Sequence, residues 1–418
     1  MNDEKLIPKL RFASYSNEWE SHKLSDILTF YSTNSFSREK LNYESGNVKN
    51  IHYGDIHTKF PTILSISGNK DVPFINADID LSKYNDDQYL QEGDLIIADA
   101  SEDYADIGKA IEVKDINNEK VLAGLHTILA RDEKNITING FKGYLFLTED
   151  LKTNIKRIAN GISVLGISKN NLSKLMVNIP NTEEQQDIVK FMSAIDKKIE
   201  LLEKKYANYQ EFKKYLMQQI FAQKLRFDNF DSEWEFKKLG EVSNVKDGTH
   251  DSPKYVSNGY PLITSKNLVN GKIDFKNVNY ISKEDYDNIN KRSNVNKGDI
   301  LFGMIGTIGN PLIAETDEFA IKNVALIKEK KELVNKFLIH IFETDFINKQ
   351  FYRLNAGGTQ KFIALGLIKD LLVPIPPIEE QLKISEFLSM VDINLNSSKN
   401  QISNMKKFKK GLLQQMFI

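Results

Sequence analysis

An internal duplication constrains this chain more than any other feature. Residues 9–24 and 224–239 agree at nine of sixteen positions, and the chain's two tryptophans, Trp19 and Trp234, occupy equivalent positions. Residues 180–221 and 376–417 agree at 16 of 42 positions without a gap. A chain of 418 residues suffices for roughly two to four domains, so the duplication predicts two similar units with separate cores.

The spacing between the repeats shrinks along the chain. The offset is 215 residues at the first repeat, 205 where residues 92–95 match 297–300, and 196 at the last repeat, so the second copy is shorter in its middle. The sequence ends at Phe417-Ile418, the equivalent of Phe221-Ala222, after which a K-L-R-F segment follows. We therefore expect the two units to close head to tail with pseudo-two-fold symmetry. A tandem duplication without closure is the alternative.

Each last repeat has the pattern of a coiled-coil helix. Apolar residues recur at alternating spacings of four and three over about five heptads, and a lysine recurs at one heptad position, Lys213 and Lys409. A helix of ~39 residues would be ~58 Å long. We expect the two helices to pair antiparallel within one chain; the alternative is that each packs only on its own unit. The predicted seam residues are Ile188, Ile195, Leu202, Tyr209, Leu216, Ile384, Val391, Ile402 and Leu412.

The regions between the repeats have a mixed pattern. Gly-Asp turns precede short apolar runs at 95–97 and 300–302, which predict buried strands, and residues 337–353 have a helical pattern. The predicted fold class is α/β (α+β), with two globular domains separated by two long antiparallel helices. The expected boundaries are 1–180 and 223–376 for the domains, and 181–222 and 377–418 for the helices, with Thr182 as the first N-cap.

The sequence excludes several kinds of chemistry. The absence of cysteine rules out disulfides, thiolate metal sites and a cysteine nucleophile. No phosphate-cradling P-loop, H-E-x-x-H or amino-methyltransferase motif is present. His52 and His57 enclose Gly54-Asp55, which favours a turn over a helical metal pair, so we expect no metal site. Glycines recur every third residue at 303–309, which predicts a tight turn with close backbone approach.

The ends of the chain and its charge suggest where the protein works. The first residues, MNDEKLIPKLRF, are not those of a signal peptide, and no run of 18 apolar residues occurs, so we expect a cytoplasmic protein without membrane contact. Lys+Arg number 56 and Asp+Glu 57, so any DNA site must be a local patch.

Several segments together resemble the specificity subunit of type I restriction–modification systems. Two variable regions are each followed by P-x-x-E-E-Q and a long helix, and the opener K-L-R-F…E-W-E…K-L is repeated. In the second half, residues 247–255 (DGTHDSPKY), 264–268 (TSKNL) and 357–362 (GGTQKF) resemble segments of that family's target recognition domains. In the first half, residues 52–56 and 161–164 depart from the pattern, so its DNA-facing residues are placed less securely.

The resemblance implies a non-catalytic subunit with two target recognition domains, each reading one half of a split double-stranded DNA target. The helices would set the spacer and dock two methyltransferase subunits. Restriction/translocase subunits would join the larger complex. S-adenosylmethionine and ATP are expected on those partners, and no cofactor is expected in this chain.

Polar, loop-like residues are the candidate DNA contacts, because lysine pairs with phosphate or guanine and asparagine can read adenine. For each of them a solvated surface is the alternative. In the first domain they are Lys49, His52, Lys59 and Lys109; in the second they are Lys246, His250, Lys254, Lys266, Asn267, Lys272, Thr359, Gln360 and Lys361.

Two charged stretches need a separate explanation. Residues 71–106 hold eleven acids and one lysine, so we expect them to face solvent or a basic partner rather than phosphate. Residues 393–418 carry five lysines and no acid, which suits either the helix dipole or a partner or spacer DNA. Two rival functions stay open: a coiled-coil scaffold that recognises only proteins, and an enzyme that itself cuts or methylates DNA, for which we find no motif.

Overall fold

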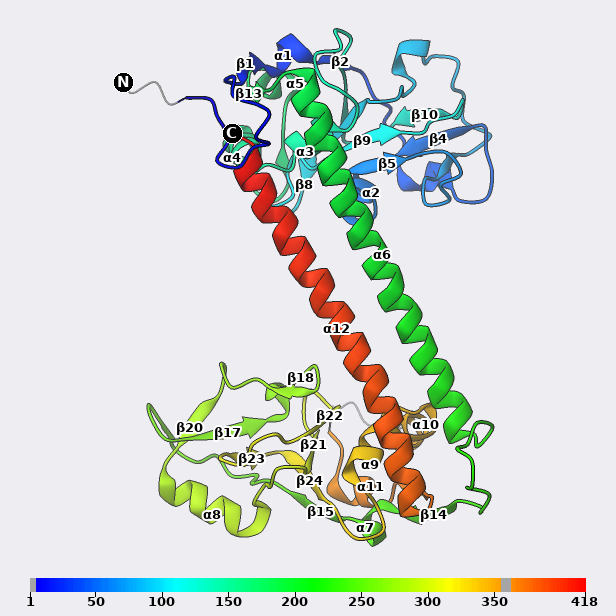
Figure 1. Ribbon diagram of the computed structural model, residues 1–418, viewed down its shortest axis with the longest axis vertical. Coiled ribbons are helices and arrows are strands. Elements are labelled where there is room, and N and C mark those ends of the chain that lie inside the picture. Colours follow the sequence, from blue (N-terminus) through cyan, green and yellow to red (C-terminus); the bar gives the residue numbers. More distant parts are fainter. Residues whose placement is uncertain (1–4, 355–361) are drawn as a thin grey trace. The chain divides into compact units, whose positions relative to one another are not determined.

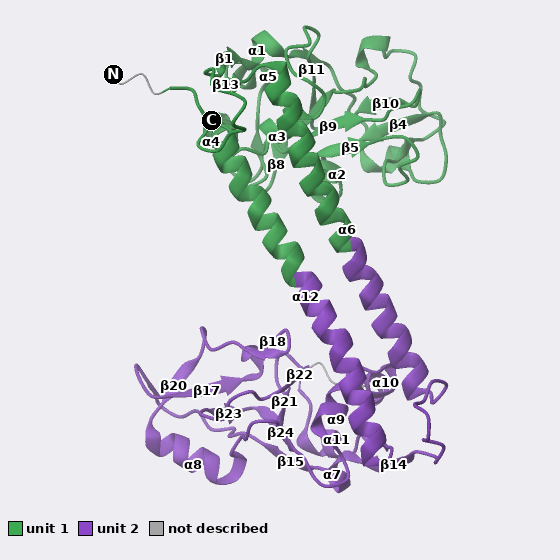
Figure 2. Cartoon of the chain, viewed as in Figure 1, with its two compact units in different colours: residues 1–203, 400–418 green, residues 204–399 purple. Residues whose placement is uncertain are grey.

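The computed structural model describes residues 5–354 and 362–418. Its contacts divide into two compact units, coloured in Figure 2: unit 1 is Met1–Glu203 with Asn400–Ile418, and unit 2 is Lys204–Lys399. The two long helices, α6 (Thr182–Phe221) and α12 (Ile378–Met416), are labelled in Figure 1, and each contributes residues to both units (Figure 2). Within the described ranges, no helix is long and apolar enough to cross a membrane.

Unit 1 is built on two mixed sheets. The five-stranded sheet has the order β2-β11-β7-β9-β5, and the four-stranded sheet has the order β10-β4-β6-β3. The strands of the first sheet are β2 (Thr29–Tyr31), β5 (Ile63–Ser65), β7 (Leu95–Ala98), β9 (Ala110–Lys114) and β11 (Thr127–Arg131). Those of the second are β3 (Leu41–Asn42), β4 (Val48–Ile51), β6 (Phe74–Ile75) and β10 (Lys120–Ala123).

Short helices and two small strand pairs complete unit 1. The pairs are β1 (Glu20–Lys23) with β13 (Met176–Ile179), and β8 (Ala100–Ser101) with β12 (Leu165–Gly166). The helices are α1 (Leu24–Ile27), η1 (Arg38–Lys40), α2 (Tyr53–Thr58), η2 (Asp86–Gln88), α3 (Phe141–Leu145), α4 (Glu149–Ile158) and α5 (Lys169–Leu172).

Unit 2 repeats this plan with a shorter middle. Its sheets have the orders β15-β24-β21-β22 and β16-β20-β17-β23, and β14 pairs with β25 as β1 pairs with β13. The strands are β14 (Glu235–Lys238), β15 (Asn244–Asp247), β16 (Tyr255–Val256), β17 (Tyr260–Thr264), β18 (Leu268–Val269), β19 (Lys272–Ile273), β20 (Asn279–Ile281), β21 (Ile300–Gly303), β22 (Gly309–Ile313), β23 (Ala320–Lys322), β24 (Val324–Lys328) and β25 (Leu372–Ile375). The helices are α7 (Leu239–Val242), η3 (Ser265–Asn267), α8 (Lys283–Ser293), α9 (Asn335–Ile341), α10 (Asp345–Leu354) and α11 (Leu365–Lys369).

The Gly-Asp turns start a central strand in each unit, as predicted. Gly93 and Gly298 have φ values of 87° and 92°, the left-handed region that favours glycine. Asp94, which follows Gly93, accepts a hydrogen bond from the Gln91 amide at 2.7 Å and pairs with Arg131. The strands that follow, β7 and β21, are buried along their whole length.

The P-x-x-E-E-Q motif ties each long helix to its unit. The Glu184 carboxylate accepts hydrogen bonds from Nε and Nη2 of Arg11, both at 2.7 Å. The equivalent Glu380 accepts hydrogen bonds from Nε and Nη2 of Arg226 at 3.0 and 2.8 Å. Both carboxylates are buried, so each needs its arginine to offset the cost of burying a charge.

The glutamine of the same motif clamps a neighbouring loop. The side-chain amide of Gln185 donates to the carbonyls of Pro180 and Ile136, and its oxygen accepts from the Ile138 amide. Gln381 makes the corresponding contacts in unit 2. The repeated motif is therefore structural in both units.

The end of each long helix completes the aromatic core of a unit. Phe417 packs edge-on against Trp19 and lies beside Phe141 in unit 1, with ring centroids 5.9 and 5.7 Å apart. In unit 2, Phe221 packs in the same way against Trp234 and Phe337.

The backbone at the chain's two ends follows the same symmetry. The Leu10 amide donates to the Gln415 carbonyl at 2.8 Å, as Leu225 donates to Gln219 at 3.1 Å in the continuous copy. The chain therefore closes head to tail in unit 1, as the duplication predicts.

The long helices pair antiparallel in each unit. In unit 1, Asp196 near the start of α6 binds Lys409 near the end of α12 at 2.5 Å. In unit 2, Lys213 near the end of α6 binds Asp392 near the start of α12 at 2.7 Å. These pairs explain why a lysine recurs in the seam.

Seven of the nine predicted seam residues are buried, and two are half-buried. The buried ones are Ile188, Ile195, Leu202, Leu216, Ile384, Val391 and Leu412, and the half-buried ones are Tyr209 and Ile402. The chain therefore has the predicted fold class, with globular α/β domains and an antiparallel coiled-coil pair.

Two local predictions are wrong. The N-cap of α6 is Asn181, whose side chain accepts from the Glu184 amide at 2.9 Å, while Thr182 is the first helical residue. The helical pattern at 337–353 is two helices, because Thr344 caps α10 by accepting from the Ile347 amide.

Candidate nucleic-acid interface

In both units, loops with polar residues gather where two parallel strands end. In unit 1 the strands are β4 and β10, and in unit 2 they are β17 and β23. Parallel strands present their carboxyl ends at one edge, so the loops that follow them must meet. His126, after β10, and Asn323, after β23, are equivalent and share a left-handed φ of 53° and 54°. We call this edge of each unit the loop edge.

The loop after β15 lies against the loop edge of unit 2. The amides of Gly248 and Thr249 donate to the carbonyls of Val324 and Ile321. A Cβ on Gly248 would lie 2.2 Å from the Ile321 carbonyl oxygen, so only glycine allows this approach.

A buried carboxylate organises the charges there. Asp247 is 8% exposed and pairs with Arg292 and with Nε2 of His250, the latter at 2.8 Å. The other ring nitrogen of His250, Nδ1, is hydrogen-bonded to the Asn323 side-chain oxygen at 2.8 Å. The hydrogen bonds to Asn323 and Asp247 raise the pKa of His250. Both ring nitrogens face acceptors, so the protonated imidazolium fits the site.

Two further loops pack onto the same edge. The Ser265 hydroxyl donates to the Asn323 carbonyl and accepts from the Met304 amide, both at 3.1 Å. A Cβ on Gly303 would lie 2.4 Å from the Thr307 carbonyl oxygen, which confirms the predicted tight turn between β21 and β22.

The structure gives Asn267 a different role from the one predicted. Its side chain is 5% exposed; the oxygen accepts from Thr264, and the amide donates to the carbonyls of Asp274 and Asn277. All its hydrogen-bonding groups therefore hold the turn, and none is left to read adenine. The predicted adenine contact would require these hydrogen bonds to break, and it stays a prediction.

The remaining candidates of unit 2 differ in exposure. His250, Lys254, Lys266 and Lys272 are exposed, and Lys246 is half-buried. Thr359, Gln360 and Lys361 lie outside the described residues.

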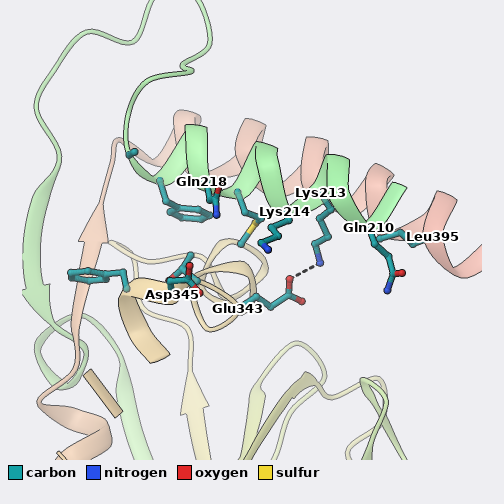
Figure 3. A pocket seen from close by; sticks show the side chains of 12 residues that line it. Gln210, Lys213, Lys214, Gln218, Glu343, Asp345 and Leu395 are labelled. Atoms are coloured by element: carbon teal, nitrogen blue, oxygen red, sulfur yellow. Dashed lines mark hydrogen bonds and ion pairs between the residues drawn. The ribbon is translucent and has the colours of Figure 1, made fainter. Parts of the chain in front are cut away.

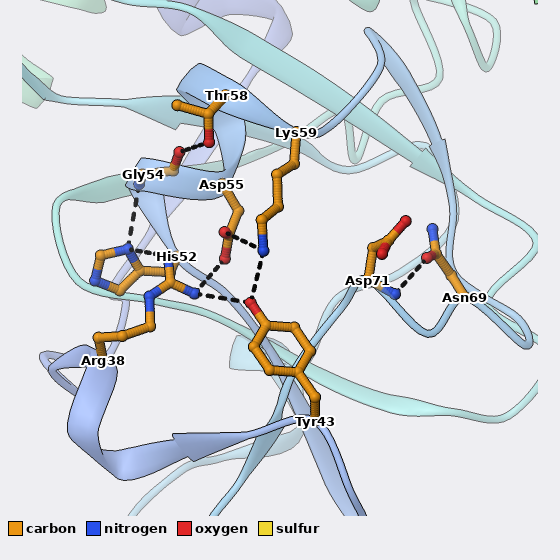
Figure 4. Close-up of polar contacts among 9 residues, drawn as sticks. All are labelled: Arg38, Tyr43, His52, Gly54, Asp55, Thr58, Lys59, Asn69 and Asp71. Carbon is orange, nitrogen blue, oxygen red and sulfur yellow. Dashed lines mark hydrogen bonds and ion pairs between the residues drawn. The ribbon is translucent and has the colours of Figure 1, made fainter. Parts of the chain in front are cut away.

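The loop edge of unit 1 holds a second organised charge cluster, shown in Figure 4. Asp55, 1% exposed, receives Nη1 of Arg38 at 2.7 Å and lies 3.6 Å from the Lys59 ammonium. Lys59 also donates to the Tyr43 hydroxyl at 2.9 Å. Asp55 and Lys59 belong to the segment around α2, which follows β4, and Arg38 comes from η1.

Two of the predicted DNA contacts of unit 1, Lys49 and Lys109, bind other groups of the protein. Lys49 is 5% exposed, pairs with Glu119 and donates to the carbonyls of Ile66 and Asn69. Lys49 would have to leave these partners to bind a phosphate, and that contact stays a prediction. Lys109 is half-buried and donates to the His57 carbonyl at 2.7 Å.

His52 and His57, the histidine pair singled out by its spacing, lie at a short helix where a turn was expected: His52 precedes α2 and His57 is within it. His52 caps α2 by accepting from the Gly54 amide at 3.2 Å, while His57 contacts the Ala100 carbonyl at 3.0 Å. Because the two rings bind different partners, they form no metal-ligating pair.

A pocket of about 570 Å³ in unit 2 is bounded by α6 and the start of α10 (Figure 3). Lys213 lies 2.5 Å from Glu343 and 2.7 Å from Asp392, and a ring nitrogen of His340 comes within 4.8 Å of both carboxylates. The Lys213 ammonium therefore already supplies a positive charge to the Glu343 and Asp392 carboxylates. The pocket lies at the helix junction and includes no residue of the loop edge.

The two arginines of these clusters, Arg38 and Arg292, are not among the residues that the sequence predicts as DNA contacts. The signal that could have found them is the scarcity of arginine, which supplies only seven of the 56 basic residues, so each arginine is a candidate for a specific role. Arg11, Arg131 and Arg226 are engaged in internal ion pairs.

Comparison with known proteins decides the family. The model of the type I restriction modification DNA specificity domain matches residues 16–209 and again residues 231–405. The chain belongs to this family. The resemblance inferred from the repeats is thereby confirmed, and each unit of this specificity protein holds most of one domain copy.

Individual relatives agree with this assignment. The chain is 25% identical to a putative type I restriction enzyme MjaX specificity subunit of Methanocaldococcus jannaschii, over 98% of this chain and 95% of the relative. It is 24% identical to the MjaVIII specificity subunit of the same organism, over 69% and 71%. The crystal structure of the type I restriction–modification S subunit from M. genitalium matches with a TM-score of 0.61 and 15% identity, covering 99% of each chain. The fold is therefore shared.

Proposed function

We propose that this chain is the DNA-specificity subunit of a type I restriction–modification complex, in which each domain reads one half of a split target. The observation that carries the proposal is the contrast between repeated and diverged residues. The Arg–Glu pair and the glutamine clamp are the same in both units, whereas the loop edges carry different residues. A shared scaffold with different loops suits two readers of different base sequences.

The rest of the proposal concerns partners. The paired helices set the spacing of the half-sites and dock two methyltransferase subunits, and the restriction/translocase subunits join that complex. S-adenosylmethionine and ATP bind on those partners, and this chain contributes specificity without catalytic residues.

The test is to co-express the chain with its methyltransferase subunit in a host without other adenine methylation and to map methylated adenines across the genome. We expect a motif of two short sequences separated by a fixed unread spacer. A contiguous motif, or methylation without sequence preference, would contradict the proposal.

The rival reading as a protein-only scaffold draws on the exposed acids of residues 71–106. Asp71, Asp78 and Asp80 are exposed and unsuited to phosphate. A mobility-shift experiment with the assembled complex separates the two functions, because a scaffold would not retard a cognate duplex more than a scrambled one.

A further inference from the structure

The buried carboxylate of Asp55 gives the first domain an arginine with a fixed orientation. A buried carboxylate is stable only when cations and donors surround it. Arg38 and Lys59 both face it, so one negative charge is matched by two positive ones and the cluster has a net charge of +1. The two cationic side chains are 43% and 46% exposed, so their outer sides face solvent.

Three contacts fix the guanidinium of Arg38. Nη1 donates to Asp55 at 2.7 Å and to the Tyr43 hydroxyl at 3.3 Å, and Nη2 lies 3.3 Å from Nδ1 of His52. This Nδ1 is an acceptor, since it already takes the Gly54 amide. Burial and the nearby guanidinium lower the pKa of His52, which keeps the ring neutral. The guanidinium is therefore oriented before any ligand arrives.

The planar guanidinium suits one DNA ligand above others. An arginine fork forms two hydrogen bonds with O6 and N7 of guanine in the major groove, the commonest specific base contact. A fork that is already oriented loses little side-chain entropy when it binds. Nε makes no hydrogen bond to any described residue, so donors remain for the base.

Lys59 suits a different ligand. Its ammonium lies 4.8 Å from the ring centroid of Tyr43 and donates to the Tyr43 hydroxyl, and its side chain is 46% exposed. A lysine ammonium is a point charge without fork geometry, which suits a phosphate oxygen rather than a base edge.

We propose that Arg38 reads a guanine in the half-site of the first domain, with Asp55 and His52 as positioning residues and Lys59 as a phosphate contact. This rests on the proposed function and assigns the chemistry of its first site. The half-site of the first domain therefore contains a guanine that Arg38 discriminates from the other bases.

The test uses the full chain assembled with its methyltransferase subunits. Wild type, Arg38→Ala, Arg38→Lys, Asp55→Asn and Lys59→Ala complexes select from a pool of duplexes randomised in both half-sites, and the bound sequences are counted. Arg38→Lys retains the charge and removes the fork. Melting temperatures check that each variant folds, including Asp55→Asn, since Arg38 and Lys59 are half-exposed and Asp55 is buried.

The arginine variants should lose roughly 5- to 150-fold discrimination at one guanine of the first half-site, with the second half-site unchanged. Lys59→Ala should weaken binding to all sequences alike and reduce the salt slope by about one. Asp55→Asn should reduce discrimination at the same base as Arg38→Lys does.

Two results would overturn the assignment. In one, the arginine variants select the same first half-site as wild type; in the other, they weaken every sequence equally. If instead the wild-type complex selects no split sequence at all, the proposed function itself fails. The result for the wild-type complex thus distinguishes failure of the Arg38 assignment from failure of the proposed function.

Discussion

Removing the Phe417 ring should loosen unit 1 through the end of α12, although the chain's N-terminal part is untouched. Phe417 is 4% exposed and packs against Trp19 and Phe141. In Phe417→Ala the helix end loses this anchor, and the nearby bond from the Leu10 amide to the Gln415 carbonyl loses its support. We expect local unfolding of unit 1 to become easier.

The magnitude follows from the burial of the ring. Truncation of a buried phenylalanine to alanine costs about 3–5 kcal/mol, of which each aromatic contact accounts for about 0.5–1.5 kcal/mol. A site at the end of a helix can partly collapse, so we expect about 3 kcal/mol. That corresponds to roughly a 100-fold loss of protection against local opening.

Amide hydrogen exchange measures this locally, because a chain with two units has no single free energy of unfolding. The amides of Trp19 and Leu24, which donate to carbonyls of unit 1, report the loss. The matched control is Phe408→Ala on the same helix, whose side chain is 53% exposed and should change stability by less than about 0.5 kcal/mol.

Unchanged protection of Trp19 and Leu24 in Phe417→Ala would refute the head-to-tail closure. An equal loss in Phe408→Ala would show that the effect comes from the helix in general. Phe221→Ala should produce the corresponding loss in unit 2 and spare unit 1.

Three further predictions concern DNA. Inserting four residues after Ala207 adds ~6 Å of helix and should lengthen the preferred spacer or abolish activity while the bases read in each half stay the same; an unmoved spacer in an active complex would exclude the helices as the ruler. Replacing residues 240–356 with those of a relative should alter one half of the methylated motif, and a change in both halves would contradict separate readers. The pKa of His250 is raised by Asn323 and Asp247, so the charge and the order that it gives the loop are fully present below pH 6.5 and are lost as the pH rises through the raised pKa. DNA binding measured across this range should weaken with rising pH, and His250→Gln should flatten the profile; an unchanged profile in that variant would assign the pH dependence to another group.

The sequence by itself determined the scaffold. Arg11 and Arg226, with their glutamates, must satisfy the same contacts in both copies, so those residues repeat and are visible by self-comparison. The helix pair is readable for a similar reason, because a heptad is a local pattern that needs no knowledge of distant contacts. Closure followed from the position of Phe417 relative to Phe221.

Only the tertiary structure decided which polar residues face outward. Lys49 reads as a surface lysine, yet every residue of β4 is buried, because packing covers both faces of that strand. Asn267 reads as a base contact, yet its amide closes a turn. Arg38 joins Asp55 across 17 residues only because the fold brings η1, which precedes β3, against α2, which follows β4. Such meetings depend on how strands cross over, and local sequence patterns carry no record of that.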